Sequence, residues 1–157
     1  TILLNKDIAK RNAAEEAVKY VKNGMVVGLG TGSTAKIAVD IIGHKLSSNF
    51  QIIGMPTSIE TKKQAEKLGI KLIDIDETDS IDLAIDGADE VSPDMSLIKG
   101  LGGALLREKK VERKAKELII IVLYVLQNHM SRVRSLPLLP TTLQFYFEIF
   151  GFPRENF

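Results

Sequence analysis

Short apolar segments alternate with helical segments along most of the chain, and this alternation restricts the fold more than any other feature. The apolar runs typical of buried strands are residues 25–29, 51–55, 71–73, 81–85 and 118–122. Helical spacing or helix stop signals mark residues 5–22, 34–46, 58–68 and 104–116. Strands that alternate with helices indicate an α/β fold, with a Rossmann-like, largely parallel sheet that has helices on both faces.

The ends of the predicted strands carry polar and glycine-rich segments. Residues 28–34, 56–58 and 86–90 each close or follow a predicted strand. In open parallel sheets, ligands bind outside the carboxyl ends of the strands. The sequence therefore predicts a ligand site where these three segments meet.

Composition argues against several classes of partner. The 157 residues carry a formal net charge of +1 without a long run of Lys or Arg, so nothing predicts binding to nucleic acid. There is no cysteine, and the two histidines stand far apart, so no transition-metal site is predicted. No apolar run has the length of a membrane span. We expect a cytoplasmic protein that binds a small molecule.

The segment GLGTGST, residues 28–34, follows a predicted strand and opens a predicted helix. Its glycines let an anion approach the backbone, and the helix N-terminus adds N–H donors and the positive end of the helix dipole. Ser33 and Thr34 add hydroxyl donors, so the segment predicts a phosphate or carboxylate site. The spacing excludes a Walker A loop, and Ser33 replaces the third glycine of a dinucleotide fingerprint. The alternative is a turn that uses glycine only for close packing.

Three carboxylates, those of Asp86, Asp89 and Glu90, follow the predicted strand of residues 81–85 in the sequence IDLAIDGADE. Asp86 ends the strand, and Asp89 comes three residues later, after a glycine that bends the chain. Closely spaced carboxylates can accept hydrogen bonds from sugar hydroxyls, and their mutual repulsion can raise one pKa. Taken singly, either aspartate is better explained as a turn or helix cap.

A lysine and a glutamate flank the glycines of LIKGLGGALLREK, residues 97–109. Lys99 precedes the glycines and can neutralise the charge of a developing oxyanion. Glu108 lies in the helix that follows, where it is a candidate proton-transfer group if it is partly desolvated. Taken singly, each is the type of residue that is usually solvated at a protein surface.

The acidic run Asp74, Asp76, Thr78 and Asp79 is a rival candidate for an ion site. It lacks the central glycine and the terminal glutamate of an EF-hand loop, so the calcium-loop pattern fails. A magnesium site stays open on residue types alone, but no further feature supports it.

Four strings together resemble the type A family of ribose-5-phosphate isomerases: GLGTGST (28–34), PTS (56–58), DLAIDGADEV (82–91) and LIKGLGGALLREK (97–109). They follow the family's order and spacing, and with the N-terminal helix the resemblance covers about residues 6–122. It implies an aldose–ketose isomerase that interconverts ribose 5-phosphate and ribulose 5-phosphate through an enediolate, in the non-oxidative pentose phosphate pathway, without a metal or other cofactor. It also allows a homo-oligomer, a dimer or a tetramer.

The resemblance implies a role for each matching residue. Glu108 is the implied base that moves a proton between C1 and C2, and Asp86 helps to open the sugar ring and holds its hydroxyls. Asp89 and Lys99 are implied to orient the substrate and to stabilise the enediolate oxygens. The residues implied to bind the end groups of the substrate are Lys10, Thr31, Gly32, Ser33 and Thr34. This chemistry is coherent, because removing a proton alpha to a carbonyl needs a placed carboxylate and a cation near the new oxyanion.

Residues 123–157 differ in composition from the isomerase-type core of residues 1–122. They hold 7 of the 9 aromatic residues, 3 of the 5 prolines and none of the lysines. Leu126 stands where the family has a lysine that contacts substrate, and we expect the smaller α+β domain of the family to be missing. One interpretation is an apolar segment that packs on the core or on a partner. A changed reading frame or splice is favoured, because composition and resemblance break at the same point.

Two other functions compete with the isomerase. A non-catalytic sugar-phosphate sensor would use the same site without turnover, although no DNA-binding helix-turn-helix is visible before Met25. An enzyme similar to acyl-CoA transferases would use Glu108 as a nucleophile. The chain is short for that class, and the acidic turn at Asp86 is of the sugar-binding type.

Overall fold

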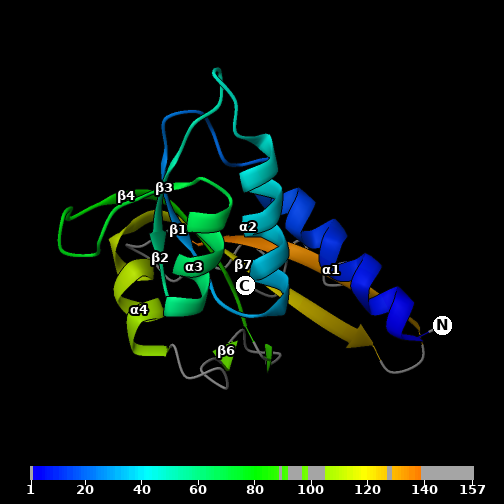
Figure 1. Cartoon of the computed structure of the whole chain (residues 1–157). Helices are drawn as coiled ribbons and strands as arrows, with labels where there is room; N and C mark the ends of the chain where they lie inside the picture. Colours follow the sequence, from blue (N-terminus) through cyan, green and yellow to red (C-terminus); the bar gives the residue numbers. More distant parts are fainter. Residues whose placement is uncertain (1, 89, 92–96, 99–104, 127–128, 139–157) are drawn as a thin grey trace.

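The computed structural model describes residues 2–88, 90–91, 97–98, 105–126 and 129–138 (Figure 1). The elements, in chain order, are α1 (Ile2–Val18), β1 (Val26–Leu29), α2 (Ser33–Lys45), β2 (Ile53–Pro56), α3 (Ile59–Lys67), β3 (Lys71–Leu72), β4 (Ile81–Gly87), β5 (Glu90–Val91), β6 (Leu97–Ile98), α4 (Leu105–Lys114), β7 (Ala115–Leu126) and β8 (His129–Leu138). The predicted alternation of strands and helices is confirmed. Among these described residues, no helix is both long and apolar enough to cross a bilayer.

The main sheet has the strand order β3-β2-β1-β4-β7-β8. The first five strands in this order, from β3 to β7, are parallel, as predicted, and β8 is antiparallel to β7. From β1 the chain first proceeds outward through β2 and β3, and it then returns to place β4 on the other side of β1. The order therefore reverses between β1 and β4, which is the place where sheets of this kind bind ligands.

Two apolar cores cover the two faces of the sheet, as the prediction of helices on both faces requires. The residues of β1 alternate between them: Val27 and Leu29 belong to the core that includes residues of α1, α2 and α3, whereas Val26 packs against the other. The second core includes Val111 of α4. This alternation follows from the period of two along a strand.

Helix α4 lies close to its face of the sheet because residue 28 has no side chain. A Cβ atom on Gly28 would lie 2.7 Å from Cγ1 of Val111 and 2.9 Å from Cβ of Ala84. The first turn of α4 lies near the end of β2, where Arg107 Nε donates to the Pro56 carbonyl. The helix is followed directly by β7, which begins beside the start of β4. It therefore runs from the carboxyl edge of the sheet back to the amino edge.

Strand β7 is longer than the predicted strand of residues 118–122 and continues past residue 122. It pairs with β4 from Ala115 and extends to Leu126, and β8 then forms the edge of the sheet. Pro137 lies within β8. A proline is compatible with this place because an edge strand has one side on which no backbone N–H is needed.

Candidate active site

The glycine-rich turn after β1 is bonded directly to the end of β4. The Gly30 N–H donates to the Ile85 carbonyl at 2.9 Å, and the Thr31 N–H donates to Oδ1 of Asp86 at 3.2 Å. The same carboxylate oxygen accepts the Gly87 N–H at 2.7 Å. Asp86 is only 1% exposed. The predicted meeting of the segments 28–34 and 86–90 is thus confirmed for their described residues, and it occurs where the strand order reverses.

Gly30 is required at its position by the backbone of β4. A Cβ atom on Gly30 would lie 2.3 Å from Oδ1 of Asp86 and 2.5 Å from the Ile85 carbonyl oxygen. Only glycine allows the turn to lie so close to the carboxylate. The close-packing use of glycine and the site-building use therefore coincide here.

Three threonines join the turn to the segment after β2. Oγ1 of Thr31 lies 2.8 Å from Oγ1 of Thr57 and 3.3 Å from Oγ1 of Thr61. Thr57 Oγ1 donates to the Leu29 carbonyl at 2.8 Å, and Thr61 Oγ1 donates to the Gly30 carbonyl at 2.9 Å. Thr57 and Thr61 are both buried. The N–H and hydroxyl of Thr31, a predicted substrate-binding residue, thus have hydrogen-bond partners within the protein.

Helix α2 begins at the same edge, and the first N–H groups of a helix have no acceptor within the helix itself. Gly32 precedes its first residue with φ of 104°, a left-handed conformation that favours glycine, and makes no side-chain cap. Ser33 is exposed, and Thr34 is buried. The amide groups of the first turn and the positive end of the helix dipole have the features that favour an anion, and the predicted anion site stays a prediction.

Glu108 lies in the first turns of α4 and is only 6% exposed. Val111, which packs at Gly28, is one helical turn further on, so Glu108 lies on the same sheet-facing side. Because α4 begins at the carboxyl edge, this places Glu108 at the same edge as Asp86. The alternative of an ordinary solvated glutamate is wrong for this chain.

The other predicted site residues are placed less completely. Lys10 lies in α1 with a partly exposed side chain, and among the described residues no hydrogen bond joins it to the glycine-rich turn. Asp89 and Lys99 lie outside the described residues.

The acidic run after β3 has a structural use that the sequence did not suggest. Oδ1 of Asp74 accepts the Ile75 N–H at 2.7 Å and Nη2 of Arg107 at 3.0 Å. These two hydrogen bonds hold the pKa of Asp74 below its usual value, the Ile75 N–H contributing most. Within the described ranges, no group of three acidic or histidine side chains could hold a metal ion.

A family model places this arrangement among known proteins. The model described as ribose 5-phosphate isomerase A (phosphoriboisomerase A) matches residues 53–138. The chain belongs to this family. The match includes β4, α4 and the whole of β8 and therefore continues past residue 122. It contains Asp86 and Glu108, whereas the glycine-rich turn precedes it.

Named relatives extend the similarity to the N-terminal part. The chain is 55% identical over 123 residues to a probable ribose-5-phosphate isomerase 3, chloroplastic, of Arabidopsis thaliana, covering 77% of this chain and 45% of that protein. It is 50% identical over 115 residues to ribose-5-phosphate isomerase A of Nitrobacter hamburgensis, covering 73% and 50%. The chain thus spans about half the length of the curated relatives that it matches.

Solved structures of the family share the fold. Ribose 5-phosphate isomerase A from Methanocaldococcus jannaschii is 42% identical with a TM-score of 0.69, covering 73% of this chain and 52% of that one. A second isomerase structure, in complex with phospho-erythronic acid, is 42% identical with a TM-score of 0.68, covering 73% and 51%.

Proposed function

We propose that this chain carries the catalytic half of a ribose-5-phosphate isomerase and interconverts ribose 5-phosphate and ribulose 5-phosphate through an enediolate. The observation that carries the proposal is the junction at the sheet reversal. There, Asp86 is bonded to the glycine-rich turn while the buried Glu108 lies at the same edge. The related structure with phospho-erythronic acid, a phosphorylated sugar acid, supports the substrate class.

The phosphate group is assigned to the start of α2. The helix dipole and the first-turn amides favour a dianion there, and Ser33 offers an exposed hydroxyl. Gly32 leaves open space, since no atom lies within 4 Å of a Cβ built on it. Thr34 and Lys10 complete the proposed contacts, and Thr31 holds the turn on Asp86.

The sugar is assigned to the space between the ends of β1 and β4 and the start of α4. Asp86 would accept hydrogen bonds from the sugar hydroxyls and assist ring opening. Glu108 would remove the proton from one carbon and return it to the neighbouring carbon, and Asp89 and Lys99 would orient the substrate and stabilise the enediolate oxygens. Burial supports this role for Glu108, because a desolvated carboxylate is a stronger base than a solvated one.

The cofactor requirement and the pathway belong to the same proposal. We propose that the reaction uses no metal or other cofactor and belongs to the non-oxidative pentose phosphate pathway. A cytoplasmic location and a dimer or tetramer stay predictions, as does the division into a core of residues 1–122 and an atypical tail of residues 123–157.

Glu108→Gln tests the central role. It keeps the size of the side chain but removes the base, so kcat for ribose 5-phosphate should fall by about 10²–10⁴, with KM changed only a few-fold. Glu66→Gln, an exposed change in α3, is the matched control and should keep full activity. Turnover by Glu108→Gln at the unmodified rate would contradict the assignment. Binding of ribose 5-phosphate without turnover in the unmodified chain would favour the sensor instead.

A further inference from the structure

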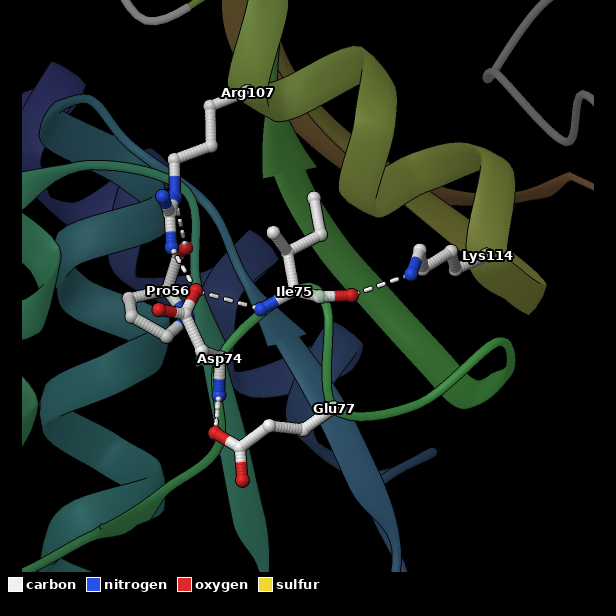
Figure 2. A network of polar contacts seen from close by, with 6 residues as sticks. All are labelled: Pro56, Asp74, Ile75, Glu77, Arg107 and Lys114. Atoms are coloured by element: carbon white, nitrogen blue, oxygen red, sulfur yellow. Dashed lines mark hydrogen bonds and ion pairs between the residues drawn. The ribbon is translucent and has the colours of Figure 1, made fainter.

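The loop between β3 and β4, residues 73–80, holds helix α4 at both ends (Figure 2). Near the helix start, Nε of Arg107 donates to the Pro56 carbonyl and Nη2 to Oδ1 of Asp74, each at 3.0 Å. At the helix end, Nζ of Lys114 donates to the carbonyls of Ile75 and of Thr78, the second at 2.7 Å. Figure 2 shows both basic side chains extending from α4 toward the loop on opposite sides of Ile75.

The loop is organised by its own hydrogen bonds. The Asp74 N–H donates to Oε1 of Glu77 at 2.7 Å, and the Glu77 N–H donates to the Asp74 carbonyl at 3.1 Å. Ile75 donates its N–H to the Asp74 carboxylate, and the Thr78 hydroxyl donates to the Ser80 carbonyl at 2.9 Å. The carboxylate that receives Arg107 is thus held in one orientation by the loop itself.

Three contacts together fix where α4 lies. Arg107 holds its first turn to the end of β2, Lys114 holds its last turn to the loop, and Val111 sets its separation from the sheet at Gly28. Glu108 follows Arg107 directly in the sequence, so any displacement or rotation of the first turn moves its carboxylate as well.

We propose that Asp74, Arg107 and Lys114 are positioning residues that set the place of the Glu108 carboxylate relative to the substrate. The proposal rests on the proposed function of Glu108 as the proton-transfer base. None of the three needs to touch the substrate, because they act through the position of α4.

Relative magnitudes separate this role from a purely structural one. The Arg107 and Asp74 side chains are 42% and 66% exposed, and ion pairs so exposed contribute little to stability. Proton transfer is far more sensitive, since a misplacement of about 1 Å can lower a rate by about 10²-fold. Loss of the contacts should therefore change turnover more than it changes thermal stability.

The test compares kcat, KM and the unfolding temperature in three variants. Arg107→Gln should lower kcat about tenfold and Asp74→Asn about threefold, with KM within about twofold of the unmodified value. Arg107→Lys should recover only part of the loss, because an ammonium group cannot make both hydrogen bonds of the guanidinium fork. Arg11→Gln is the control, since it removes an exposed arginine paired with Glu15 at 3.0 Å in α1. Unchanged kcat in Arg107→Gln would overturn the proposal, as would a kcat loss explained fully by unfolding.

Hydrogen exchange tests the placement of α4 independently of turnover. Amides of residues 105–114 should exchange at least about fivefold faster in Arg107→Gln than in Arg11→Gln. Equal exchange in the two variants would refute the positioning role even if the unmodified chain isomerises ribose 5-phosphate. Faster exchange in Arg107→Gln, in a chain that shows no isomerisation, would reject only the function proposed for Glu108 and leave the placement of α4 supported.

Discussion

Replacement of Gly30 by alanine perturbs the contact between the glycine-rich turn and Asp86. The added Cβ would lie 2.3 Å from Oδ1 of Asp86 and 2.5 Å from the Ile85 carbonyl oxygen, where ordinary contact begins near 3.4 Å. The turn must therefore move away from β4 by roughly 1 Å, as the difference between these distances shows. This movement also weakens the hydrogen bond from the Thr31 N–H to Asp86.

Three contributions determine how Gly30→Ala changes the free energy of unfolding. Forced overpacking costs about 1–3 kcal/mol, and the weakened hydrogen bond costs about 1 kcal/mol more. Lower entropy of the unfolded chain offsets about 0.4–1 kcal/mol. We expect Gly30→Ala to lower the free energy of unfolding by about 2 kcal/mol. Gly24→Ala is the control: Gly24 has φ of 82° and no atom within 4 Å of a built Cβ, so only about 1 kcal/mol of backbone strain is expected.

Urea unfolding followed by circular dichroism measures both variants. With an m-value of about 1–3 kcal/mol/M, the midpoint for Gly30→Ala should fall by about 1 M or more, and clearly further than for Gly24→Ala. Titration with ribose 5-phosphate should also show weaker binding to Gly30→Ala, because the turn that leads to α2 has moved. Coincident unfolding curves for the two variants would refute the reasoning, since Asp86 would then not constrain the turn.

Two further predictions concern hydrogen bonds around the sheet. Thr61→Val should lower the free energy of unfolding in urea by about 1–2 kcal/mol, because the Gly30 carbonyl loses its buried hydroxyl donor. Thr61→Ser keeps that donor and should lower the free energy of unfolding less. Equal losses in the two variants would count against the threonine network. The pKa of Asp82 is lowered by its hydrogen bonds to Lys116 and the Val26 N–H. The ionised carboxylate therefore stabilises the folded protein fully above the unfolded pKa of about 3.9. This stabilisation is lost as the pH falls through the lower folded pKa. Asp82→Asn should therefore unfold with a shallower dependence on pH below about pH 4, measured by circular dichroism at fixed urea, and an unchanged slope would contradict this.

The strands and the glycine-rich turn could be predicted because their signals are local. Apolar runs bounded by glycine or proline mark the strands, and glycines before a helix mark the turn. Boundaries were less secure. The predicted helix of residues 5–22 ends at Val18, although Val21 fits the apolar spacing. Val21 is indeed buried, but its N–H bonds to the Val18 carbonyl three residues back, so burial alone explains the pattern.

The start of β7 was missed for a tertiary reason. The stretch from Ala115 to Glu117 contains good helix formers, so the sequence predicts that the preceding helix continues to residue 116. In the structure Ala115 already pairs with Ile81 of β4. Pairing with a strand more than thirty residues earlier in the sequence overrides the local helix propensity here, and no local sequence pattern indicates this pairing.

The sequence predicts that the strand-end residues meet, but it does not predict the contacts that support them. Asp86 and the turn were found because both follow apolar runs directly. Thr61 was not found, because a threonine inside a predicted helix carries no signal that it bonds to Gly30. The contact between Asp74 and Arg107 also joins distant segments, and the acidic run by itself suggests only an ion site. Such contacts become visible only when the helices are placed on the sheet.

Gly28 carries a consequence for evolution at this site. With Cγ1 of Val111 only 2.7 Å from where a first side-chain atom would be, a single methyl group there would force Val111 of α4 or its neighbours on the sheet to shift. Gly28, although buried in a central strand, thus sets how closely α4 can approach the sheet at Val111. Laboratory selection for altered sugar preference should accordingly find Gly28 intolerant of change, while exposed positions on the outer side of α4 vary freely.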